Sequence, residues 1–206
     1  MNVVELTKSL ISCPSVTPSN EGVLDLLQKE LTDMGFTCNR YLFSDTDTPD
    51  VDNLFAKIGS GAPHLCFGGH TDVVPVGDEN AWSSNPFEAT EKNGKLYGRG
   101  ASDMKSAIAA FVSAVREYLE NNQVKGTISL LITNDEEGPA INGTRKVLEE
   151  IYKNGEKIDS CLVGEPTCPN NLGEMIKIGR RGSMTTTIKV SGKQGHVAYP
   201  EWTLNP

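Results

Sequence analysis

The residues His70, Thr71 and Asp72 have the types and spacing of a metal-binding histidine and its carboxylate partner. In an extended backbone, residues i and i+2 project to the same side, so Asp72 can accept a hydrogen bond from one imidazole nitrogen of His70. The other nitrogen is then free for a metal ion, which is the usual arrangement around a histidine ligand. Most isolated pairs of this kind lie in solvated turns, so the prediction of a metal site depends on further ligands.

Three further acidic sites follow apolar or glycine-rich stretches: Asp103, the adjacent pair Glu136 and Glu137, and Glu165. The pair and Glu165 come after residues 128–132 and 161–163, whose apolar and partly β-branched composition predicts short buried strands. In open α/β sheets, ligands bind beyond the carboxyl ends of the strands, where these side chains are expected. We therefore predict a metal site rather than a set of ordinary solvated loop carboxylates.

Asp103 has two interpretations, because an apolar pattern with helical spacing follows it over residues 104–119. Ser102 is predicted to be the N-cap of this helix, which would place Asp103 in the first turn, where the helix dipole favours a carboxylate. Glycine at positions 98 and 100 lets the backbone pass close to a bound centre. For that reason we favour a metal ligand.

The remaining pattern predicts strands and helices in alternation. Helices are expected at residues 23–34, 104–119 and 143–152, and strands at residues 53–58, 64–67, 128–132, 159–163 and 174–178. This alternation is typical of an α/β fold with a mainly parallel sheet and helices on both faces. Residues 76–100 are predicted to form a long loop. Near the end of the sequence, residues 184–190 alternate threonine with apolar side chains, which predicts the first strand of a second domain.

The composition of the 206-residue chain narrows the classes of partner. Its formal net charge of −8 argues against nucleic acid or an anionic membrane as a partner. Neither a signal peptide nor a transmembrane helix is recognised in the sequence. Five cysteines without Cys-x-x-Cys spacing indicate reduced thiols rather than a disulfide framework. We therefore expect a cytoplasmic protein that acts on a small-molecule substrate.

Five motifs, taken in this order, resemble those of one enzyme family: His70-Thr-Asp72, Gly98-Arg-Gly-Ala-Ser-Asp103, Asp135-Glu-Glu-Gly138, Gly164-Glu165-Pro166 and Gly195-His196. The sequence is similar to the dizinc metallopeptidases and deacylases that include aminoacylase and carboxypeptidase G. This resemblance implies a metal-dependent amide hydrolase that is a homodimer in its full-length form. It implies that residues 1–179 belong to a zinc-peptidase-like catalytic domain whose C-terminal part is missing. Residues 180–206 would then begin a truncated α+β lid and dimerisation domain.

The metal ligands of the family carry over to matching positions of this sequence. By that resemblance, Asp103 bridges two zinc ions, for which cobalt is an alternative. His70 and Glu165 complete the protein ligands of one ion, and Glu137 belongs to the other. Asp72 orients the imidazole of His70.

The resemblance also implies roles in catalysis. Glu136 would be the general base that acts on the water between the metal ions. Successive side chains point apart outside a helix, so one of two adjacent glutamates can bind metal while its neighbour faces the water. His196 would be the lid histidine that reaches the active site from the partner subunit and stabilises the oxyanion, although an exposed loop histidine is an alternative. Arg180 and Arg181 could bind substrate carboxylates or form a solvated pair.

One part of the family's pattern has no counterpart in this sequence. The family has a further histidine ligand near its C-terminus, whereas the histidines here are His64, His70 and His196. The ion at Glu137 would then have only carboxylates and water, a poorer set for zinc than one with nitrogen or sulfur ligands. We expect an N-terminal fragment that binds at least one metal weakly and turns over poorly or not at all.

Several alternatives remain open. Within the family, the sequence most resembles the deacylases of bacterial lysine synthesis, which implies an N-succinylated amino acid as substrate. An acetylornithine deacetylase or a dipeptidase is the alternative within the same family. Ser102 and Lys105 also match the Ser-x-x-Lys motif of penicillin-recognising serine hydrolases, although this interpretation leaves His70 and Glu165 unexplained. A non-enzymatic metal-binding fragment is the third alternative.

Overall fold

The computed structural model describes residues 1–179, 182, 184–204 and 206. The chain divides into two compact units, Met1–Pro166 and Thr167–Pro206. The first unit holds the sheet and the four α-helices, and the second contains a short 3₁₀ helix at Pro200–Trp202. The domain boundary predicted between residues 179 and 180 differs from this division between compact units, and it stays a prediction.

A five-stranded sheet forms the centre of the first unit, with the strands in the order β1-β2-β6-β3-β7. Their bounds are Thr37–Asp45 for β1, Thr48–Ser60 for β2, His64–His70 for β3, Gly126–Thr133 for β6 and Ser160–Val163 for β7. β3 pairs in parallel with both β6 and β7, whereas β2 pairs antiparallel with β1 and β6. Four of the strands therefore run in one direction and β2 runs in the other, as a mainly parallel sheet requires.

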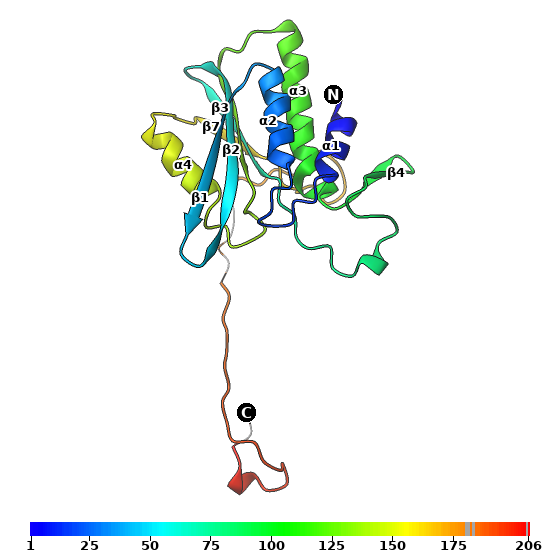
Figure 1. The fold of residues 1–206 in the computed structure, drawn as a ribbon, viewed down its shortest axis with the longest axis vertical. Coiled ribbons are helices and arrows are strands. Elements are labelled where there is room, and N and C mark those ends of the chain that lie inside the picture. The colour runs from blue at the N-terminus through cyan, green and yellow to red at the C-terminus, as the bar shows by residue number, and fades with distance from the viewer. Residues whose placement is uncertain (180–181, 183, 205) are drawn as a thin grey trace. The chain divides into compact units, whose positions relative to one another are not determined.

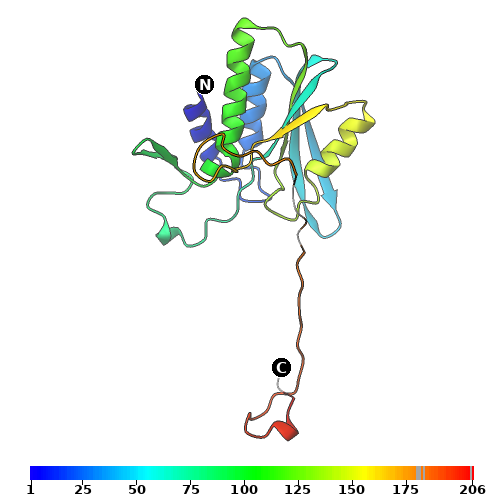
Figure 2. The ribbon, with the colours of Figure 1, turned by 180° about the vertical axis from the view of Figure 1, so that it is seen from behind.

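Helices cover both faces of this sheet, as the alternation of the sequence predicts (Figure 1). Turned to the opposite view, α4 again lies across the sheet from the other three helices (Figure 2). The bounds are Val3–Ile11 for α1, Val23–Asp33 for α2, Ser106–Asn121 for α3 and Thr144–Lys153 for α4. The predicted helices at residues 23–34 and 143–152 are thus confirmed as α2 and α4.

The two faces are built from alternating residues of the same strands, because successive strand side chains point to opposite sides. Leu54 and Leu130 belong to the hydrophobic core that contains residues of α1, α2 and α3. Phe55 and Leu131, their neighbours in sequence, pack instead with α4 residues in a second core. A strand buried on both faces appears in the sequence as a largely apolar run, as residues 128–132 do, with Ser129 as the one polar residue.

The register of the parallel strands brings the predicted ligands to one edge. His70, the last residue of β3, lies opposite Thr133, the last residue of β6, and Gly68 lies opposite Val163, the last residue of β7. The residues that follow β6 and β7 therefore leave the sheet at the same edge as the end of β3. This arrangement places the loops with Glu136 and Glu165 beside His70.

The segment before α3 differs from the prediction. Ser102 is not the N-cap of this helix, because α3 begins at Ser106 and its N-cap position is Lys105. Asp103 has φ −122° and ψ 102° and Met104 has φ −131°, which are not helical values. Asp103 thus lies in a kinked segment ahead of α3 and outside its first turn, and the dipole interpretation of its carboxylate is wrong.

Two predicted strands do not form. Residues 174–178 and 184–190 have no strand conformation, and within them Ile178 and Met184 are 101% and 90% exposed. Their apolar alternation suits a strand, but an isolated strand gains no ladder hydrogen bonds. The strand predicted at residues 159–163 does form as β7, although all four of its residues are exposed rather than buried. β7 is the last strand of the sheet in the described part of the chain.

The loop predicted at residues 76–100 contains short elements of its own. They are a 3₁₀ helix at Glu79–Ala81 and a hairpin of β4, Thr90–Lys92, with β5, Lys95–Tyr97. Trp82 anchors this segment, since its indole Nε1 donates to the carbonyl oxygen of Val76 at 2.9 Å. The guanidinium of Arg99 lies 5.1 Å from the centre of the Trp82 ring, a distance suited to a cation–π interaction.

Candidate metal centre

His70 stands at the centre of a cluster of carboxylates. Its side chain is 1% exposed, and its Nε2 lies 3.1 Å from Asp103 Oδ1 and 3.5 Å from Glu165 Oε1. Glu136 Oε2 is 4.0 Å from the same nitrogen. Residues from the ends of three separate sequence segments therefore converge on one imidazole nitrogen, as the strand-end pattern predicts.

The other imidazole nitrogen is held by Asp72, but through the main chain. Nδ1 of His70 lies 2.9 Å from the carbonyl oxygen of Asp72, and 3.6 Å from the nearer carboxylate oxygen of that residue. The prediction from spacing placed the carboxylate as the hydrogen-bond acceptor. The carbonyl oxygen takes that role here, and as the acceptor at Nδ1 it favours the tautomer that leaves Nε2 free for a metal.

The carboxylate of Asp72 holds the acidic pair instead. It accepts the backbone N–H of Glu136 at 3.1 Å and that of Glu137 at 2.9 Å, and the Asp72 side chain is fully buried. A buried carboxylate without such partners would be costly, and hydrogen bonds to a charged acceptor are the stronger kind. Asp72 thus connects the end of β3 with the loop that follows β6.

The approach of Asp103 depends on the packing of Met104 behind His70. The backbone N–H of His70 donates to Sδ of Met104 at 3.4 Å. A Cβ atom at Gly69 would lie 2.8 Å from Cε of Met104, so glycine leaves the room that this side chain fills. Gly100, with φ +80°, starts the kinked segment, in a conformation that glycine adopts readily.

Glu165 reaches the cluster from the end of β7. A Cβ atom at the preceding residue, Gly164, would lie 2.6 Å from Cζ of Phe67 and 2.9 Å from Cβ of Ala107. Glycine is therefore the residue that lets this chain segment pass so close to β3 and α3. The side chain of Glu165 is 18% exposed, so part of its charge is removed from water.

The electrostatics of the cluster are those of crowded carboxylates without a cation. Burial raises the pKa of Glu165 above its ordinary value, and the charge of Asp103 raises it further. The pKa of Glu137 is raised by burial and then by Asp103 as well. Burial lowers the pKa of His70, but the hydrogen bond to the Asp72 carbonyl and the neighbouring carboxylates outweigh it, so that the pKa is raised. A divalent cation would relieve this repulsion.

The geometry of three of these residues fits a metal ion. Ligand atoms of His70, Asp103 and Glu165 all lie within 4.8 Å of one another. Ligands about 2.0–2.2 Å from a tetrahedral zinc ion are roughly 3.4 Å apart, close to the 3.1 and 3.5 Å found around Nε2. One imidazole with two carboxylates is also a donor set that zinc accepts. The residues present therefore fit a divalent metal ion.

Glu137 and His196 are predicted site residues for which the structure shows, among the residues that it describes, no hydrogen bond or ion pair with this group. Glu137 is next to Glu136 and within electrostatic reach of Asp103, but it is not among the three residues whose ligand atoms converge. His196 belongs to the second compact unit, where it is exposed and its Nδ1 accepts the backbone N–H of Ala198 at 3.2 Å. Its role at the site stays a prediction. Arg180 and Arg181 lie outside the described residues.

The Ser-x-x-Lys interpretation has no support in the structure. Lys105 is fully buried and its Nζ donates to the carbonyl oxygen of Cys13 at 2.8 Å. Burial lowers the pKa of Lys105 to about 8. Ser102 is exposed and lies outside any α-helix, and in the described part of the chain no hydrogen bond joins it to Lys105. The lysine therefore forms a hydrogen bond with the segment that follows α1 and is not placed to activate a serine.

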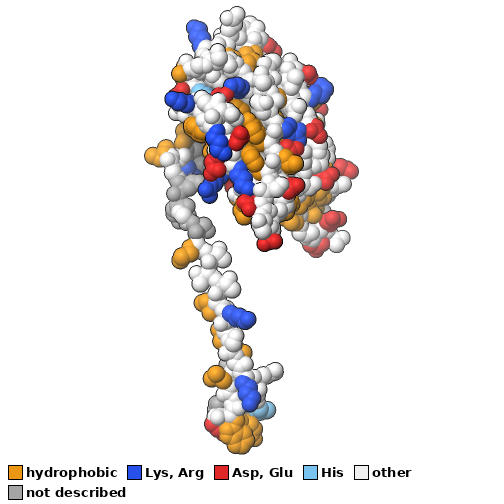
Figure 3. Space-filling view, turned by 60° about the vertical axis from the view of Figure 1, so that its left-hand side comes forward, with side chains coloured by type: hydrophobic (Ala, Val, Ile, Leu, Met, Phe, Trp, Pro, Cys, Tyr) orange, Lys and Arg blue, Asp and Glu red, His pale blue; other side chains and the backbone are white. Residues whose placement is uncertain are grey.

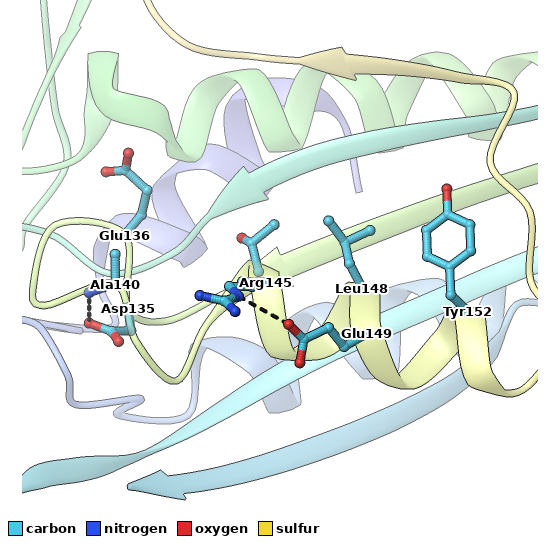
Figure 4. Close-up of a pocket in the computed structure, with 8 residues that line it drawn as sticks. Asp135, Glu136, Ala140, Arg145, Leu148, Glu149 and Tyr152 are labelled. Carbon is cyan, nitrogen blue, oxygen red and sulfur yellow. Dashed lines mark hydrogen bonds and ion pairs between the residues drawn. The ribbon is translucent and has the colours of Figure 1, made fainter. Parts of the chain in front are cut away.

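Beside the cluster lies a pocket of about 680 Å³, whose lining includes Asp135, Glu136 and the outer side of α4 (Figure 4). The three converging residues do not line it. Asp135 is the one residue of the acidic run to which sequence reasoning assigned no role, and it is 3% exposed. A run of three consecutive acidic residues two positions after a buried strand is the signal that could have drawn attention to it.

A comparison with known families matches residues 66–204 to the pattern of peptidase family M20/M25/M40. This match covers more than half of the chain. The chain belongs to peptidase family M20/M25/M40. The family predicted from the five motifs is thereby confirmed.

Two curated relatives resemble nearly the whole chain. A succinyl-diaminopimelate desuccinylase of Parvibaculum lavamentivorans is 58% identical over 203 residues, which is 98% of this chain and 51% of the relative. Another, of Rhodospirillum centenum, is 56% identical over 98% of this chain and 53% of the relative. The chain therefore spans about half the length of these M20/M25/M40 relatives.

Solved structures share the fold of the family. Human carnosine dipeptidase 1 superposes with a TM-score of 0.69 at 24% identity, covering 78% of this chain and 38% of the dipeptidase. An M20 family metallo-carboxypeptidase, Sso-CP2 of Sulfolobus solfataricus, gives a TM-score of 0.67 at 25% identity, covering 80% and 37%. Within the described residues, none of the helices has the length and apolar character needed to cross a membrane.

Proposed function

We propose that the protein is a metal-dependent amide hydrolase that converts N-succinyl-LL-2,6-diaminopimelate and water to succinate and LL-2,6-diaminopimelate in lysine biosynthesis. The observation that carries the chemistry is the convergence of His70, Asp103 and Glu165 on one point. The identity of 56–58% to succinyl-diaminopimelate desuccinylases supports this choice of substrate.

The residues divide between two zinc ions in this proposal, with cobalt as a replacement. His70 and Glu165 would hold one ion, Glu137 the other, and Asp103 would bridge both. A bound divalent cation supplies two effects: it lowers the pKa of a coordinated water and polarises the amide carbonyl. The closeness of Nε2 of His70 to both carboxylates supports the first site, and the position of Glu137 beside Glu136 supports the second.

Glu136 acts as the general base in this mechanism. Its carboxylate takes a proton from the attacking water and later gives a proton to the leaving amine nitrogen. The carboxylate is 43% exposed, so water and substrate can reach it. Since Asp72 holds the backbone of Glu136, the side chain extends toward the site from a fixed point of the main chain. His196 of a partner subunit would donate to the oxyanion that develops on the substrate carbonyl.

The proposal extends to the assembly and location of the protein. We place residues 1–179 in the catalytic domain and residues 180–206 at the start of a lid and dimerisation domain. The full-length protein is a homodimer in this proposal. A cytoplasmic location follows from the five free cysteines and from a role in amino-acid synthesis.

The second candidate is another amide hydrolysis of the same family, by an acetylornithine deacetylase or a dipeptidase. The similarity to carnosine dipeptidase 1, at 24% identity, bears on the fold and does not favour a dipeptide substrate. A metal-binding fragment without turnover is the third candidate.

A direct assay separates these candidates. The purified protein with added zinc or cobalt is offered N-succinyl-LL-2,6-diaminopimelate, N-acetylornithine and a dipeptide, and the released amine is measured. We expect the succinylated substrate to be hydrolysed fastest and EDTA to abolish its hydrolysis. Faster release from either competitor would overturn the substrate assignment, and full activity in EDTA would overturn the metal mechanism.

The low turnover expected of the 206-residue chain has its own test. The same assay is run on this chain and on a version extended to include a histidine that can bind the second ion. Equal turnover by both would contradict the expectation.

A further inference from the structure

Asp135 is a buried carboxylate that the proposed mechanism does not use. It directly precedes the acidic pair, and its side chain accepts three backbone N–H groups, from Ala140 at 3.1 Å, Ile141 at 3.0 Å and Asn142 at 3.2 Å. Figure 4 shows the contact with Ala140 beside Glu136. The carboxylate therefore gathers the far end of the loop that begins with the pair.

The near end of the same loop is held by Asp72. Its carboxylate accepts the N–H groups of Glu136 and Glu137, as described above. Together the two buried aspartates bind five backbone N–H groups of residues 136–142. Hydrogen bonds from N–H groups to a carboxylate are stronger than those between neutral partners, so this segment has little freedom to move.

Gly138 shows how closely the loop is wrapped around Asp135. A Cβ atom at this position would lie 2.8 Å from Oδ1 of Asp135 and 2.7 Å from Oγ1 of Thr17. The backbone just after the pair thus passes between these two side chains with no space for any other residue. The side chain of Asp135 therefore packs directly against the turn that begins with Glu136 and Glu137.

We propose that Asp135 is a positioning residue, which fixes the main chain of Glu136 and Glu137 by closing the loop behind them. The inference rests on the proposed function, in which Glu137 binds metal and Glu136 serves as the base. Because adjacent side chains outside a helix point apart, holding the main chain sets the directions of both carboxylates at once. Substitution of a residue that contacts a metal ligand and orients it typically lowers metal affinity about 10- to 100-fold.

Amide hydrogen exchange followed by NMR tests the positioning without any metal. In Asp135→Ala, exchange at Glu136 and Glu137 is expected to become faster, although neither N–H contacts Asp135. Acceleration confined to residues 140–142 would mean that Asp135 holds only its own partners, and would overturn the proposal. Asp159→Ala is the matched control, since its carboxylate accepts the N–H of His64 at the opposite end of β3.

Titration with Co²⁺ tests the consequence at the metal centre. We expect Asp135→Ala to bind Co²⁺ about tenfold more weakly and with an altered visible absorption band, whereas Asp159→Ala keeps both. Asp135→Asn is the second variant. Its one amide oxygen can accept from Ile141 and Asn142, whereas the amide nitrogen cannot accept from Ala140. We therefore expect the Co²⁺ affinity of Asp135→Asn to lie between those of the unsubstituted chain and Asp135→Ala.

The two measurements separate the failure of this inference from that of the proposed function. If the unsubstituted chain binds Co²⁺, and Asp135→Asn and Asp135→Ala bind it with the same affinity and spectrum, the positioning role is overturned while the metal site stands. If the unsubstituted chain binds no Co²⁺, the metal site fails, and faster exchange at Glu136 and Glu137 would still support the positioning.

Discussion

At the scale of single residues, the two histidines of β3 show how surroundings decide the chemistry of a side chain. Both are buried, at opposite ends of the strand. The ring of His64 contacts the Lys157 carbonyl oxygen at 2.9 Å and Ser129 Oγ at 2.8 Å, so both nitrogens have neutral partners. His70 has one neutral partner and presents its other nitrogen to carboxylates. His64 is a core residue, and His70 is a candidate ligand.

This contrast gives a prediction with a control on the same strand. His70→Ala is expected to weaken Co²⁺ binding more than about 100-fold, since even residues that merely orient a ligand cost up to that factor. His64→Gln should keep the metal affinity but lower the free energy of unfolding by about 1–3 kcal/mol, because buried partners lose hydrogen bonds. Calorimetric titration and urea unfolding measure the two effects. An unchanged Co²⁺ affinity in His70→Ala would contradict the assignment.

The neighbouring glutamates allow a second comparison at this scale. In a version of the chain extended to include a histidine that can bind the second ion, Glu136→Gln is expected to bind metal normally and to lower kcat by roughly 10²–10⁴, the usual contribution of a general base. Glu137→Gln is expected to reduce the metal content instead, because an amide is a weaker ligand than a carboxylate. Elemental analysis of the purified variants and an amine-release assay distinguish them. The roles would be exchanged if Glu136→Gln lost metal and Glu137→Gln kept it.

At the scale of elements, close packing between β3, β7 and the kinked segment before α3 sets the positions of the ligands. Met104, the residue after Asp103, packs against Gly69 of β3, and Gly164, the residue before Glu165, packs against Phe67 of β3. A small displacement of either segment would separate the ligand atoms, because they come from different elements.

Gly164→Ala tests this dependence on packing. The added Cβ would lie 2.6 Å from Phe67 Cζ, so we expect a loss of about 1–3 kcal/mol in the free energy of unfolding and weaker metal binding as Glu165 moves. Gly179→Ala is the control, because a Cβ there meets nothing within 4 Å; its effect should stay within about 0.5 kcal/mol. Urea unfolding and Co²⁺ titration of both variants measure the free energy of unfolding and the metal affinity. Equal metal affinity in both would show that Glu165 does not depend on this contact.

At the scale of the whole molecule, the chain carries a net negative charge, and several of its carboxylates gather around one histidine. The net charge is −8, and the face of the first unit seen in Figure 3 carries acidic, basic and hydrophobic side chains interspersed. The concentrated negative charge lies at the sheet edge, where Asp103, Glu136 and Glu165 surround His70. Repulsion there opposes folding until a cation is bound.

Metal binding should therefore stabilise the whole chain. With Co²⁺ at one hundred times its Kd, the free energy of unfolding is expected to rise by about 2.7 kcal/mol, since the folded state alone presents the assembled site. Urea unfolding with Co²⁺ and with excess EDTA measures the difference, and His70→Ala should abolish it. A curve that does not shift with Co²⁺ would argue against a site in the folded chain.

The sequence by itself determined the local elements and indicated the candidate ligands. Periodic apolar residues predict α2 and α4, and short stretches rich in apolar residues predict β3 and β6, because these patterns depend on neighbours within a few positions. The rule that ligands lie beyond strand ends placed Glu136 and Glu165 near His70. The glycines at positions 98 and 100 favoured Asp103 as a further ligand. These signals survive without knowledge of the fold.

The tertiary structure alone decided how distant residues meet. The carboxylate of Asp72 turns away from His70 to backbone groups 64 and 65 residues later in the chain, and no local pattern encodes that partner. Residues 174–178 and 184–190 have strand-like sequences but no strand conformation, because a strand also needs a neighbour for its hydrogen bonds. The kink at Asp103 likewise depends on contacts with β3. The residue types of the candidate site can be read from the sequence, whereas the positions of those residues depend on contacts between parts of the chain that are far apart in sequence.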